Sequence, residues 1–245
     1  MKRIAVITGG GGGIGRAVAI SLSENGWNVV VAGRTESSLN ETVSMMKAEG
    51  LAVVCDVSAA TDVEHLFAET VKAFGQVDML FNNAGIAAPP VPIDDLSTEN
   101  WDQIVAINLT GAFLCARAAF GQMRKQKTGG RIINNGSVSA TTPRPFSAPY
   151  TCTKHAITGL TKSLSLDGRN YGITCSQIDL GNVSSAMGDQ MAAGVLQPNG
   201  TTLEEPTIPV GPVCDAILYM VDLPKDANVL NITVMANNMP FVGRG

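Results

Sequence analysis

Short, mostly apolar runs recur along the chain, and a stretch with helical spacing follows nearly every one of them. The apolar runs lie at 3–8, 28–32, 52–55, 79–82, 131–134, 174–178 and 231–236. The helical stretches lie at 14–25, 37–49, 60–74, 100–124, 151–170 and 213–222. Strands that are apolar on both faces are typical of a parallel sheet covered by helices. The alternation therefore predicts an α/β fold.

Right-handed crossovers between such units give a doubly wound, Rossmann-like parallel sheet of about seven strands, with helices on both faces. We find no internal repeat and no interdomain linker in the 245 residues, and therefore expect a single domain over 1–245. Two loops, 84–95 and 181–209, are long for this fold. Both follow predicted strands at the edge where open α/β sheets bind ligands, so we expect 181–209 to be a substrate lid.

Composition and charge argue against several classes of protein. Hydrophobic residues make up 45% and charged residues 16%, which favours a packed core over disorder. The net charge of −4 argues against a nucleic-acid partner. The five cysteines form no CxxC pair and the two histidines form no metal-ligand pattern, so we expect reduced thiols and no catalytic metal. We find no signal-peptide core and no membrane span, and so expect no membrane partner and a cytoplasmic location.

The turn between the first predicted strand and the first helix consists almost entirely of glycine, Thr8-Gly-Gly-Gly-Gly-Gly-Ile-Gly15. Glycines there let the backbone approach a pyrophosphate, and the helix N-terminus supplies unpaired N–H groups and the positive end of its dipole. A flexible turn is the alternative, but the strand before and the helix after are the context that binding requires. Gly9, Gly13 and Gly15 fit the spacing TGxxxGxG rather than GxGxxG.

Tyr150 and Lys154 lie four residues apart and therefore on one face of a predicted helix. A tyrosine hydroxyl is a weak acid at neutral pH, and a neighbouring ammonium stabilises its phenolate form. Ser137 follows the fifth predicted strand, whose carboxyl end neighbours the start of this helix, so we expect the three side chains to converge. Asn108 lies in an apolar part of the long helix, either as a packing amide or as a functional kink.

These motifs together resemble the short-chain dehydrogenase/reductase family, and the resemblance extends from Thr8 to the last predicted strand. It implies an NAD(P)-dependent oxidoreductase that transfers a hydride between the cofactor and a small carbonyl or secondary alcohol substrate. In the family pattern, Ser137 binds the substrate oxygen and Tyr150 is the general acid/base. Lys154 holds the nicotinamide ribose and favours the phenolate, while Asn108 anchors a water molecule. The resemblance also implies a homo-oligomer, which we expect to be a tetramer.

Arg34 follows Gly33 at the end of the second predicted strand, where a dinucleotide fold meets the adenosine ribose. A guanidinium there favours a 2′-phosphate, so we expect NADP(H) to be preferred, with NAD(H) as the alternative cofactor. A solvated surface arginine is the other interpretation of Arg34, and a turn aspartate is the other interpretation of Asp56, which the resemblance places near the adenine. The resemblance assigns cofactor contacts to Gly9, Gly13, Ile14, Gly15, Arg34, Asp56, Asn83, Ala84, Gly85, Tyr150, Lys154, Gly181, Val183 and Ser185.

Two segments depart from the family pattern. Leu180 replaces the proline that usually precedes Gly181, and the last residues lack the family's usual ending. We expect Phe241 and Val242, near the end of the chain, to help cover a subunit contact, because so short an apolar tail cannot bury itself alone.

Three other functions occur on this fold, and the residues of this chain argue against each of them. A cofactor-binding regulator typically lacks the tyrosine or the lysine, and an epimerase or dehydratase generally carries a larger C-terminal substrate region. A halide-releasing enzyme of this build lacks the glycine turn.

The residues that we expect in the substrate pocket wall are Ser139, Pro145, Phe146, Met187 and Met191. They are moderately apolar and include no charged clamp, which favours a neutral ketone or aldehyde.

Overall fold

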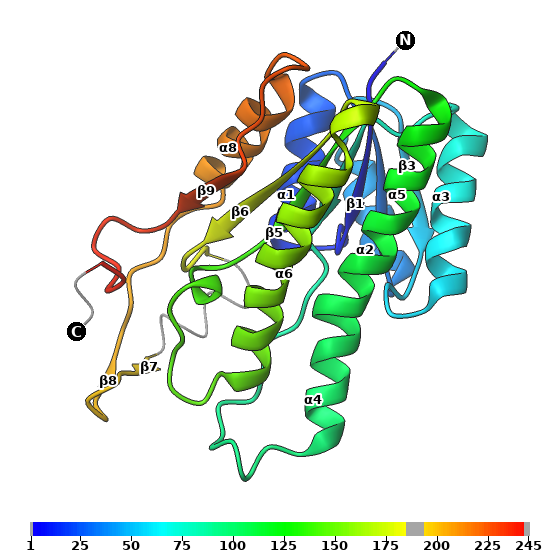
Figure 1. The fold of residues 1–245 in the computed structure, drawn as a ribbon. Helices are drawn as coiled ribbons and strands as arrows, with labels where there is room; N and C mark the ends of the chain where they lie inside the picture. The colour runs from blue at the N-terminus through cyan, green and yellow to red at the C-terminus, as the bar shows by residue number, and fades with distance from the viewer. Residues whose placement is uncertain (1, 185–193, 243–245) are drawn as a thin grey trace.

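The computed structural model describes residues 2–184 and 194–242 of the chain. Within these residues the main sheet has seven strands in the order β3-β2-β1-β4-β5-β6-β9, and all their pairings are parallel (Figure 1). The strands are β1 (Ile4–Thr8), β2 (Asn28–Gly33), β3 (Gly50–Val54), β4 (Met79–Asn82), β5 (Gly130–Asn135), β6 (Ile173–Leu180) and β9 (Asn231–Val234). The strand order reverses at β1, which lies between β2 and β4, so the predicted doubly wound sheet is confirmed.

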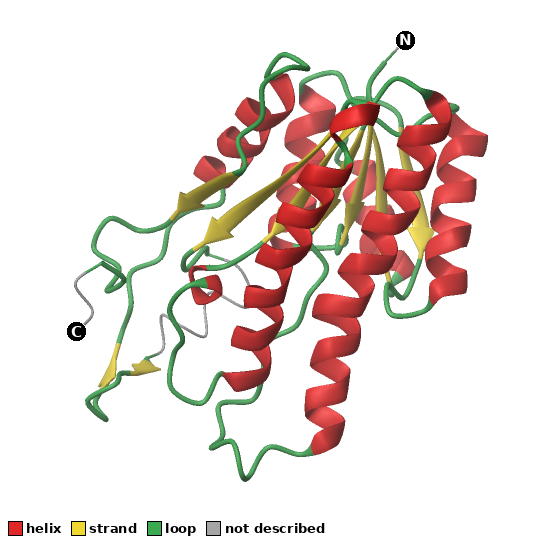
Figure 2. Cartoon of the chain, viewed as in Figure 1, coloured by secondary structure: helices red, strands yellow, loops and turns green. Residues whose placement is uncertain are grey.

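Helices cover both faces of this sheet (Figure 2). One face carries α1 (Gly13–Glu24), α2 (Glu36–Ser44) and α8 (Gly211–Asp222), and the other carries α3 (Ala60–Phe74), α5 (Ala112–Gln126) and α6 (Ala148–Asp167). Side chains alternate along β1, so that Ala5 and Ile7 join the first core while Val6 joins the second. The strand is apolar at every position because it is buried on both faces.

The long helix predicted at 100–124 is present but is not α-helical throughout. It begins as α4 (Thr98–Val105), widens into a π-helical segment η1 (Ala106–Gly111) and continues as α5. A Cβ on Gly111 would lie 2.7 Å from Cγ2 of Val57, so glycine lets this segment pack closely against the loop after β3. The π-helical segment therefore sits where the helix passes the carboxyl edge of the sheet.

Two further predictions of secondary structure need correction. The helix predicted at 37–49 ends at Ser44, because the chain must turn before Gly50, which pairs with Val29 of β2. The loop expected at 181–209 contains a short antiparallel hairpin, β7 (Val195–Leu196) with β8 (Thr202–Leu203). Strands of two residues carry too little pattern to be predicted from sequence.

By length and composition alone, the stretch Thr98–Gln126 is long and apolar enough to cross a membrane. The expectation that no segment has this character was therefore wrong. Core helices of folded domains pass the same test, and here Cys115, Ala116, Ala119 and Met123 are fully buried against the sheet.

Candidate active site

The glycine turn after β1 has a backbone that requires glycine. Gly9 and Gly13 have φ angles of +66° and +50°. A Cβ on Gly15 would lie 2.2 Å from the carbonyl oxygen of Gly9. The N-terminus of α1 has no side-chain cap and no acidic residue in its first turn, and a Cβ on Gly12 would meet nothing within 4 Å. The turn thus presents an uncapped helix N-terminus beside open space, which suits an anionic group.

The segment after β4 is bound directly to this turn. The Thr8 hydroxyl accepts hydrogen bonds from the backbone N–H groups of Asn83 and Ala84, both at 3.0 Å. The Asn83 amide donates to the Thr8 carbonyl at 3.0 Å, and it accepts a hydrogen bond from Nδ2 of Asn135 at 2.9 Å. Asn83, Ala84 and Gly85 therefore lie where β1, β4 and β5 end together, as expected for the carboxyl edge of a parallel sheet.

Lys154 is buried at this edge, where its side chain contacts the end of β5 and lies beside the Tyr150 ring. Its Nζ donates to the carbonyl oxygen of Asn135 at 2.7 Å and lies 5.5 Å from the centre of the Tyr150 ring. Both residues come from α6, in which a spacing of four residues places them one turn apart. The ammonium is thereby fixed beside the tyrosine ring, as the spacing predicted.

Ser137 begins the short 3-10 turn η2 (Val138–Ala140), which packs against α6. Its hydroxyl accepts a hydrogen bond from the Ser139 N–H at 3.1 Å. Its own backbone N–H donates to Oδ1 of Asp179 at 2.9 Å. A buried carboxylate on β6, which sequence reasoning missed, thus fixes the backbone that carries Ser137.

Asn108 is buried within η1, and its side chain binds the loop that follows β4. Oδ1 accepts a hydrogen bond from the Ile86 N–H at 2.8 Å, and Nδ2 donates to the Ile86 carbonyl at 2.9 Å. The contacts match the packing interpretation of Asn108, and the residue also lies within the irregular part of the helix. A functional role for this irregularity stays a prediction, and so does the expected contact of Asn108 with a water molecule.

Arg34 and Asp56 follow neighbouring strands. Arg34 is exposed directly after β2, and Asp56 lies two residues after the end of β3. The Ser58 hydroxyl and N–H donate to Asp56 at 2.7 and 2.9 Å, and together they lower the pKa of its carboxyl group, with a further contribution from the Arg34 guanidinium. The Ser58 contacts match the turn interpretation of Asp56, and the carboxylate lies close enough to Arg34 for the guanidinium to contribute to its lowered pKa.

The end of β6 packs against the C-terminal segment. A Cβ on Gly181 would lie 2.6 Å from Cβ of Met235 and 2.7 Å from Sδ of Met239, so the backbone passes very close to this segment. Met239 is buried against Val138. The tail therefore does bury part of itself, contrary to our expectation, although Val242 is exposed.

Some of the remaining predicted site residues lie within the part of the chain that the structure describes, and others lie outside it. Ile14 lies in the first turn of α1, and Val183 forms a β-bridge with Ile208. Ser139 is buried, while Phe146 is exposed and has a φ angle of +58°, which is uncommon for a residue with a side chain. Ser185, Met187 and Met191 lie outside the described residues.

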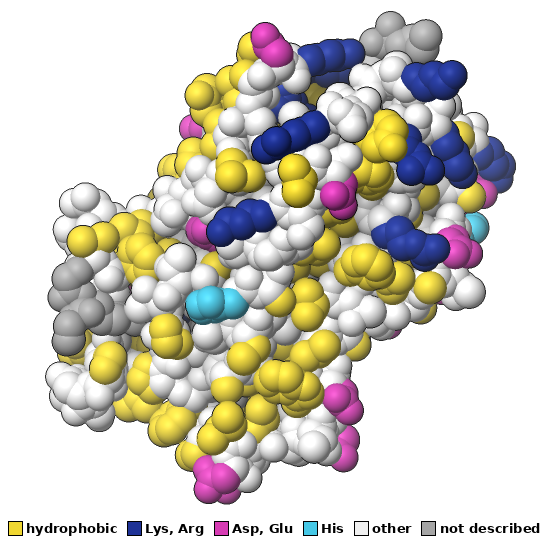
Figure 3. Space-filling model, viewed as in Figure 1, with side chains coloured by type: hydrophobic (Ala, Val, Ile, Leu, Met, Phe, Trp, Pro, Cys, Tyr) yellow, Lys and Arg dark blue, Asp and Glu magenta, His cyan; other side chains and the backbone are white. Residues whose placement is uncertain are grey.

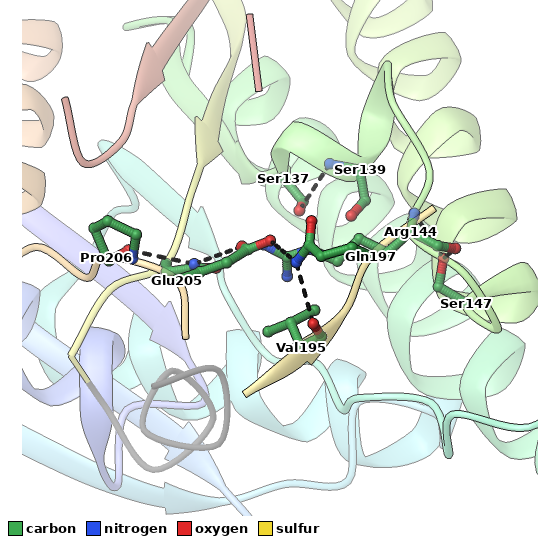
Figure 4. Close-up of polar contacts among 9 residues, drawn as sticks. Ser137, Ser139, Arg144, Ser147, Val195, Gln197, Glu205 and Pro206 are labelled. Atoms are coloured by element: carbon green, nitrogen blue, oxygen red, sulfur yellow. Dashed lines mark hydrogen bonds and ion pairs between the residues drawn. The ribbon is translucent and has the colours of Figure 1, made fainter. Parts of the chain in front are cut away.

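Sequence reasoning also missed a buried polar group in the neighbourhood of Ser137. It consists of Arg144, Asn182, Gln197 and Glu205, which are joined by hydrogen bonds and an ion pair (Figure 4). These residues come from loops far apart in sequence, and each looks like a solvated loop residue when taken alone. Among the described residues, no group of three or more His, Cys, Asp or Glu side chains is arranged to hold a metal ion.

The doubly wound sheet, the glycine turn at an uncapped helix N-terminus and the Ser137, Tyr150 and Lys154 side chains at one edge are compatible with an NAD(P)-dependent oxidoreductase that acts on hydroxyl or carbonyl groups, and the family comparison assigns the chain to this class. The family model described as short chain dehydrogenase matches residues 3–195. The chain belongs to this family.

Similar proteins are found by sequence and by structure. The short chain dehydrogenase/reductase astE of Aspergillus oryzae is 34% identical over 206 residues, which cover 82% of this chain and 77% of that protein. The 3beta-hydroxysteroid dehydrogenase of Mediterraneibacter gnavus is 35% identical over 197 residues, or 79% of this chain and 71% of that protein. The crystal structure of a variant of actinorhodin polyketide ketoreductase with NADPH aligns with a TM-score of 0.84 and 27% identity, covering 96% of both chains.

Proposed function

We propose that this chain transfers a hydride between NADP(H) and a small, neutral carbonyl or secondary alcohol substrate, with Tyr150 as the general acid/base. The observation that carries the proposal is the buried Lys154 ammonium, held by the Asn135 carbonyl and placed 5.5 Å from the Tyr150 ring. A regulator without catalysis has no need for a cation fixed beside a tyrosine at the cofactor edge. An epimerase or dehydratase on this fold was the other alternative, and membership of the short chain dehydrogenase family argues against it.

The cofactor-binding residues fit a dinucleotide. Gly9, Gly13, Ile14 and Gly15 surround the uncapped N-terminus of α1, which suits a diphosphate. Oδ1 of Asn135 is buried and has no hydrogen-bond partner among the described residues, so this edge retains an acceptor for a bound hydroxyl or water. We assign the other contacts to Arg34, Asp56, Asn83, Ala84, Gly85, Tyr150, Lys154, Gly181, Val183 and Ser185. The bound cofactor supplies or accepts the hydride.

The chain's own side chains supply the proton and hold the reacting oxygen. In reduction, the Ser137 hydroxyl donates a hydrogen bond to the substrate carbonyl oxygen, and the Tyr150 hydroxyl gives that oxygen its proton. The carbonyl carbon gains a hydride, the oxygen gains a proton, and tyrosine is left as a phenolate beside the Lys154 ammonium. Oxidation of an alcohol reverses each transfer. Asn108 holds the Ile86 loop, and we propose that it also anchors a water that returns the proton.

Arg34 supports NADP(H) over NAD(H). Its exposed guanidinium lies at the end of β2, and no acidic residue occupies the preceding position, which is Gly33. A carboxylate there would repel a 2′-phosphate, whereas a guanidinium can bind it through two parallel hydrogen bonds. The related polyketide ketoreductase was crystallised with NADPH.

A neutral substrate is supported by the charge balance near Ser137. The Arg144 cation of that neighbourhood is paired with the Glu205 carboxylate. Ser139 and Phe146 then contribute a hydroxyl and an aromatic ring rather than a charge. The similar proteins include a steroid dehydrogenase and a polyketide ketoreductase.

We further propose that the chain works in the cytoplasm as one catalytic domain over 1–245, with the described residues 194–208 as part of a substrate lid.

The sharpest test of the mechanism is Tyr150→Phe. Phenylalanine keeps the ring and the packing of α6 but removes the hydroxyl that carries the proton, so kcat should fall by about 10²–10⁴-fold. The NADPH dissociation constant should change only a few-fold and the melting temperature should stay close to that of the wild type. Turnover of a carbonyl panel, NADPH fluorescence and thermal unfolding measure the three quantities on one sample. Persistence of near-normal turnover would rule the mechanism out.

A further inference from the structure

Four polar side chains from separate segments meet in a buried network near Ser137. Arg144 lies in the loop between η2 and α6, Asn182 follows β6, Gln197 lies in the β7–β8 hairpin and Glu205 follows β8. Asn182, Gln197 and Glu205 are each more than nine-tenths buried. Figure 4 shows Arg144, Gln197 and Glu205 converging, with the hydroxyls of Ser137 and Ser139 pointing to the same side. We call these four residues the Arg144–Glu205 network.

Glu205 is the centre of the network. Its Oε2 forms an ion pair with Nη2 of Arg144 and accepts a hydrogen bond from Nδ2 of Asn182 at 3.0 Å. Its Oε1 accepts a hydrogen bond from Nε2 of Gln197 at 3.1 Å. Arg144 Nη2 also donates to Oδ1 of Asn182 at 2.9 Å. A carboxylate so deeply buried is stable only with its partners in place, so these contacts fix the segments relative to one another.

The network continues to the helix turn that carries Tyr150. The Ser147 hydroxyl donates to the Arg144 carbonyl at 2.7 Å and accepts from the Arg144 N–H at 3.2 Å. The same hydroxyl lies 2.9 Å from Oγ1 of Thr151, and the Thr151 N–H donates to the Ser147 carbonyl at 2.8 Å. Thr151 is the residue after Tyr150. A continuous chain of contacts therefore joins Glu205, through Arg144 and Ser147, to the first turn of α6.

The other end of the network reaches the cofactor edge. Asn182 follows Gly181 directly, and its Nδ2 also donates to the Pro206 carbonyl at 3.3 Å. The Ile208 N–H donates to the Asn182 carbonyl at 2.9 Å. The segment 195–206 is thus bound to the end of β6 on one side and to the loop before Tyr150 on the other.

We propose that Arg144 and Glu205 are positioning residues, which fix the segment 195–206 against the first turn of α6 and so set the substrate wall and the aim of the Tyr150 hydroxyl. The proposal rests on the function proposed above. Neither residue transfers a proton or a hydride. Their effect is on geometry, and misplacement of a reacting group by about 1 Å can cost a rate factor of about 10².

Glu205→Gln tests this proposal because it keeps the side-chain shape and removes the charge that binds Arg144. We expect kcat/KM for the carbonyl to fall roughly ten- to a hundredfold. The NADPH dissociation constant should stay within about threefold, because the glycine turn and Arg34 are untouched. Turnover is expressed per NADPH-binding site, so partial unfolding does not mimic the effect. The matched control is Asp222→Asn, which removes the exposed Arg3–Asp222 ion pair at the opposite edge of the sheet and should leave kcat/KM unchanged.

A double variant, Arg144→Met with Glu205→Met, separates positioning from stability. Replacing a buried ion pair by apolar side chains commonly restores stability, because no charge is left unpaired. We expect the melting temperature to recover toward the wild-type value while kcat/KM stays low. Recovery of kcat/KM together with the melting temperature would assign the network a purely structural role and overturn the proposal. So would a Glu205→Gln variant with unchanged kcat/KM.

Tyr150→Phe is measured alongside these variants, so that failure of the proposed mechanism can be distinguished from failure of the positioning role. Normal turnover by Tyr150→Phe would refute the proposed mechanism itself. Loss of turnover by Tyr150→Phe together with normal turnover by Glu205→Gln would refute the positioning role alone.

Discussion

Arg34 is the residue that should decide cofactor choice. Arg34→Asp removes a cation from the end of β2 and introduces repulsion toward a 2′-phosphate. We expect the KM for NADPH to rise by roughly 10²-fold, and the KM for NADH to change little or to fall. Steady-state kinetics with both cofactors give the comparison. Lys2→Asp, an equal change of charge at an exposed residue before β1, should leave both KM values alone.

An unaltered KM for NADPH in Arg34→Asp would mean that Arg34 is the solvated surface side chain that the sequence left as an alternative. The Tyr150→Phe result would stand in that case, because proton transfer does not depend on which cofactor carries the hydride.

The buried thiols should make the protein less stable in alkaline solution. Burial, with Asp62 and Asp56 nearby, raises the pKa of Cys55 to about 12, and burial raises that of Cys214 to about 11. An unfolded thiol ionises near pH 8.5, so the stabilisation is complete below that pH and is lost as pH rises toward the folded values. Urea unfolding should show the free energy of unfolding falling by up to about 1.4 kcal/mol per pH unit and per thiol above pH 9. In Cys55→Ala the fall should be shallower, and an identical slope would contradict the assignment.

The positions of the proposed catalytic residues at one edge of the sheet could be predicted from the sequence because their signal is local. Tyr150 and Lys154 are one helical turn apart, and Ser137 follows a strand whose end is recognisable by its apolar run. Glu205 and Arg144 could not be predicted, because their pairing depends on loops that are 61 residues apart and have no periodic pattern. Asp179 was missed for a related reason: within a strand, a single acidic residue does not reveal which backbone N–H it will bind.

At the scale of elements, the glycine turn provides a matched pair of substitutions. Gly15→Ala places a Cβ 2.2 Å from the Gly9 carbonyl oxygen, whereas Gly12→Ala meets nothing within 4 Å. We expect Gly15→Ala to lower the free energy of unfolding by about 1–3 kcal/mol, and Gly12→Ala to change it little. Urea denaturation measures both. Equal stability of the two variants would show that the turn adjusts more easily than its geometry indicates.

Central strands were predicted closely from the sequence, because a strand buried on both faces is apolar at every position, and helix α3 has its predicted bounds as well. The strands nearer the edges were less exact, since β3 begins two residues earlier and β6 ends two residues later than predicted. β4 has the predicted bounds, and β1 differs by one residue. The end of α2 was wrong because the helical pattern continues through Met45 and Met46, while pairing of Gly50 with Val29 requires an earlier turn. The π-helical segment η1 changes only the hydrogen-bond register of a helix, which leaves no trace in the apolar pattern.

At the scale of the whole molecule, we expect a homotetramer in which the α5–α6 face is a subunit contact. An open groove on this face is lined by Val71, Phe113, Leu114, Phe120, Leu160 and Leu164, and Figure 3 shows apolar side chains grouped over these helices. Phe113 is 47% exposed, so Phe113→Asp should weaken assembly without disturbing the core. Light scattering at micromolar concentration measures the mass. Met45→Asp, at an equally exposed apolar residue elsewhere, is the control.

A wild-type protein that is strictly monomeric would refute the tetramer. Phe241 and Val242 were expected to help cover a subunit contact, but deletion of the tail from Met239 onward would not test assembly. Met239 is a core residue, so its loss would disturb the fold as well as any subunit contact.

The position of Met239 also has a practical consequence for producing this protein. The C-terminal segment packs against Val138, which is the residue after Ser137, and against Gly181, which follows the end of β6. The chain enters the sheet at Ile4 from the opposite edge, far from these residues (Figure 1). We therefore expect an affinity tag or fusion partner on the amino terminus to disturb activity less than one on the carboxyl terminus, because the C-terminal segment packs against the residue next to Ser137.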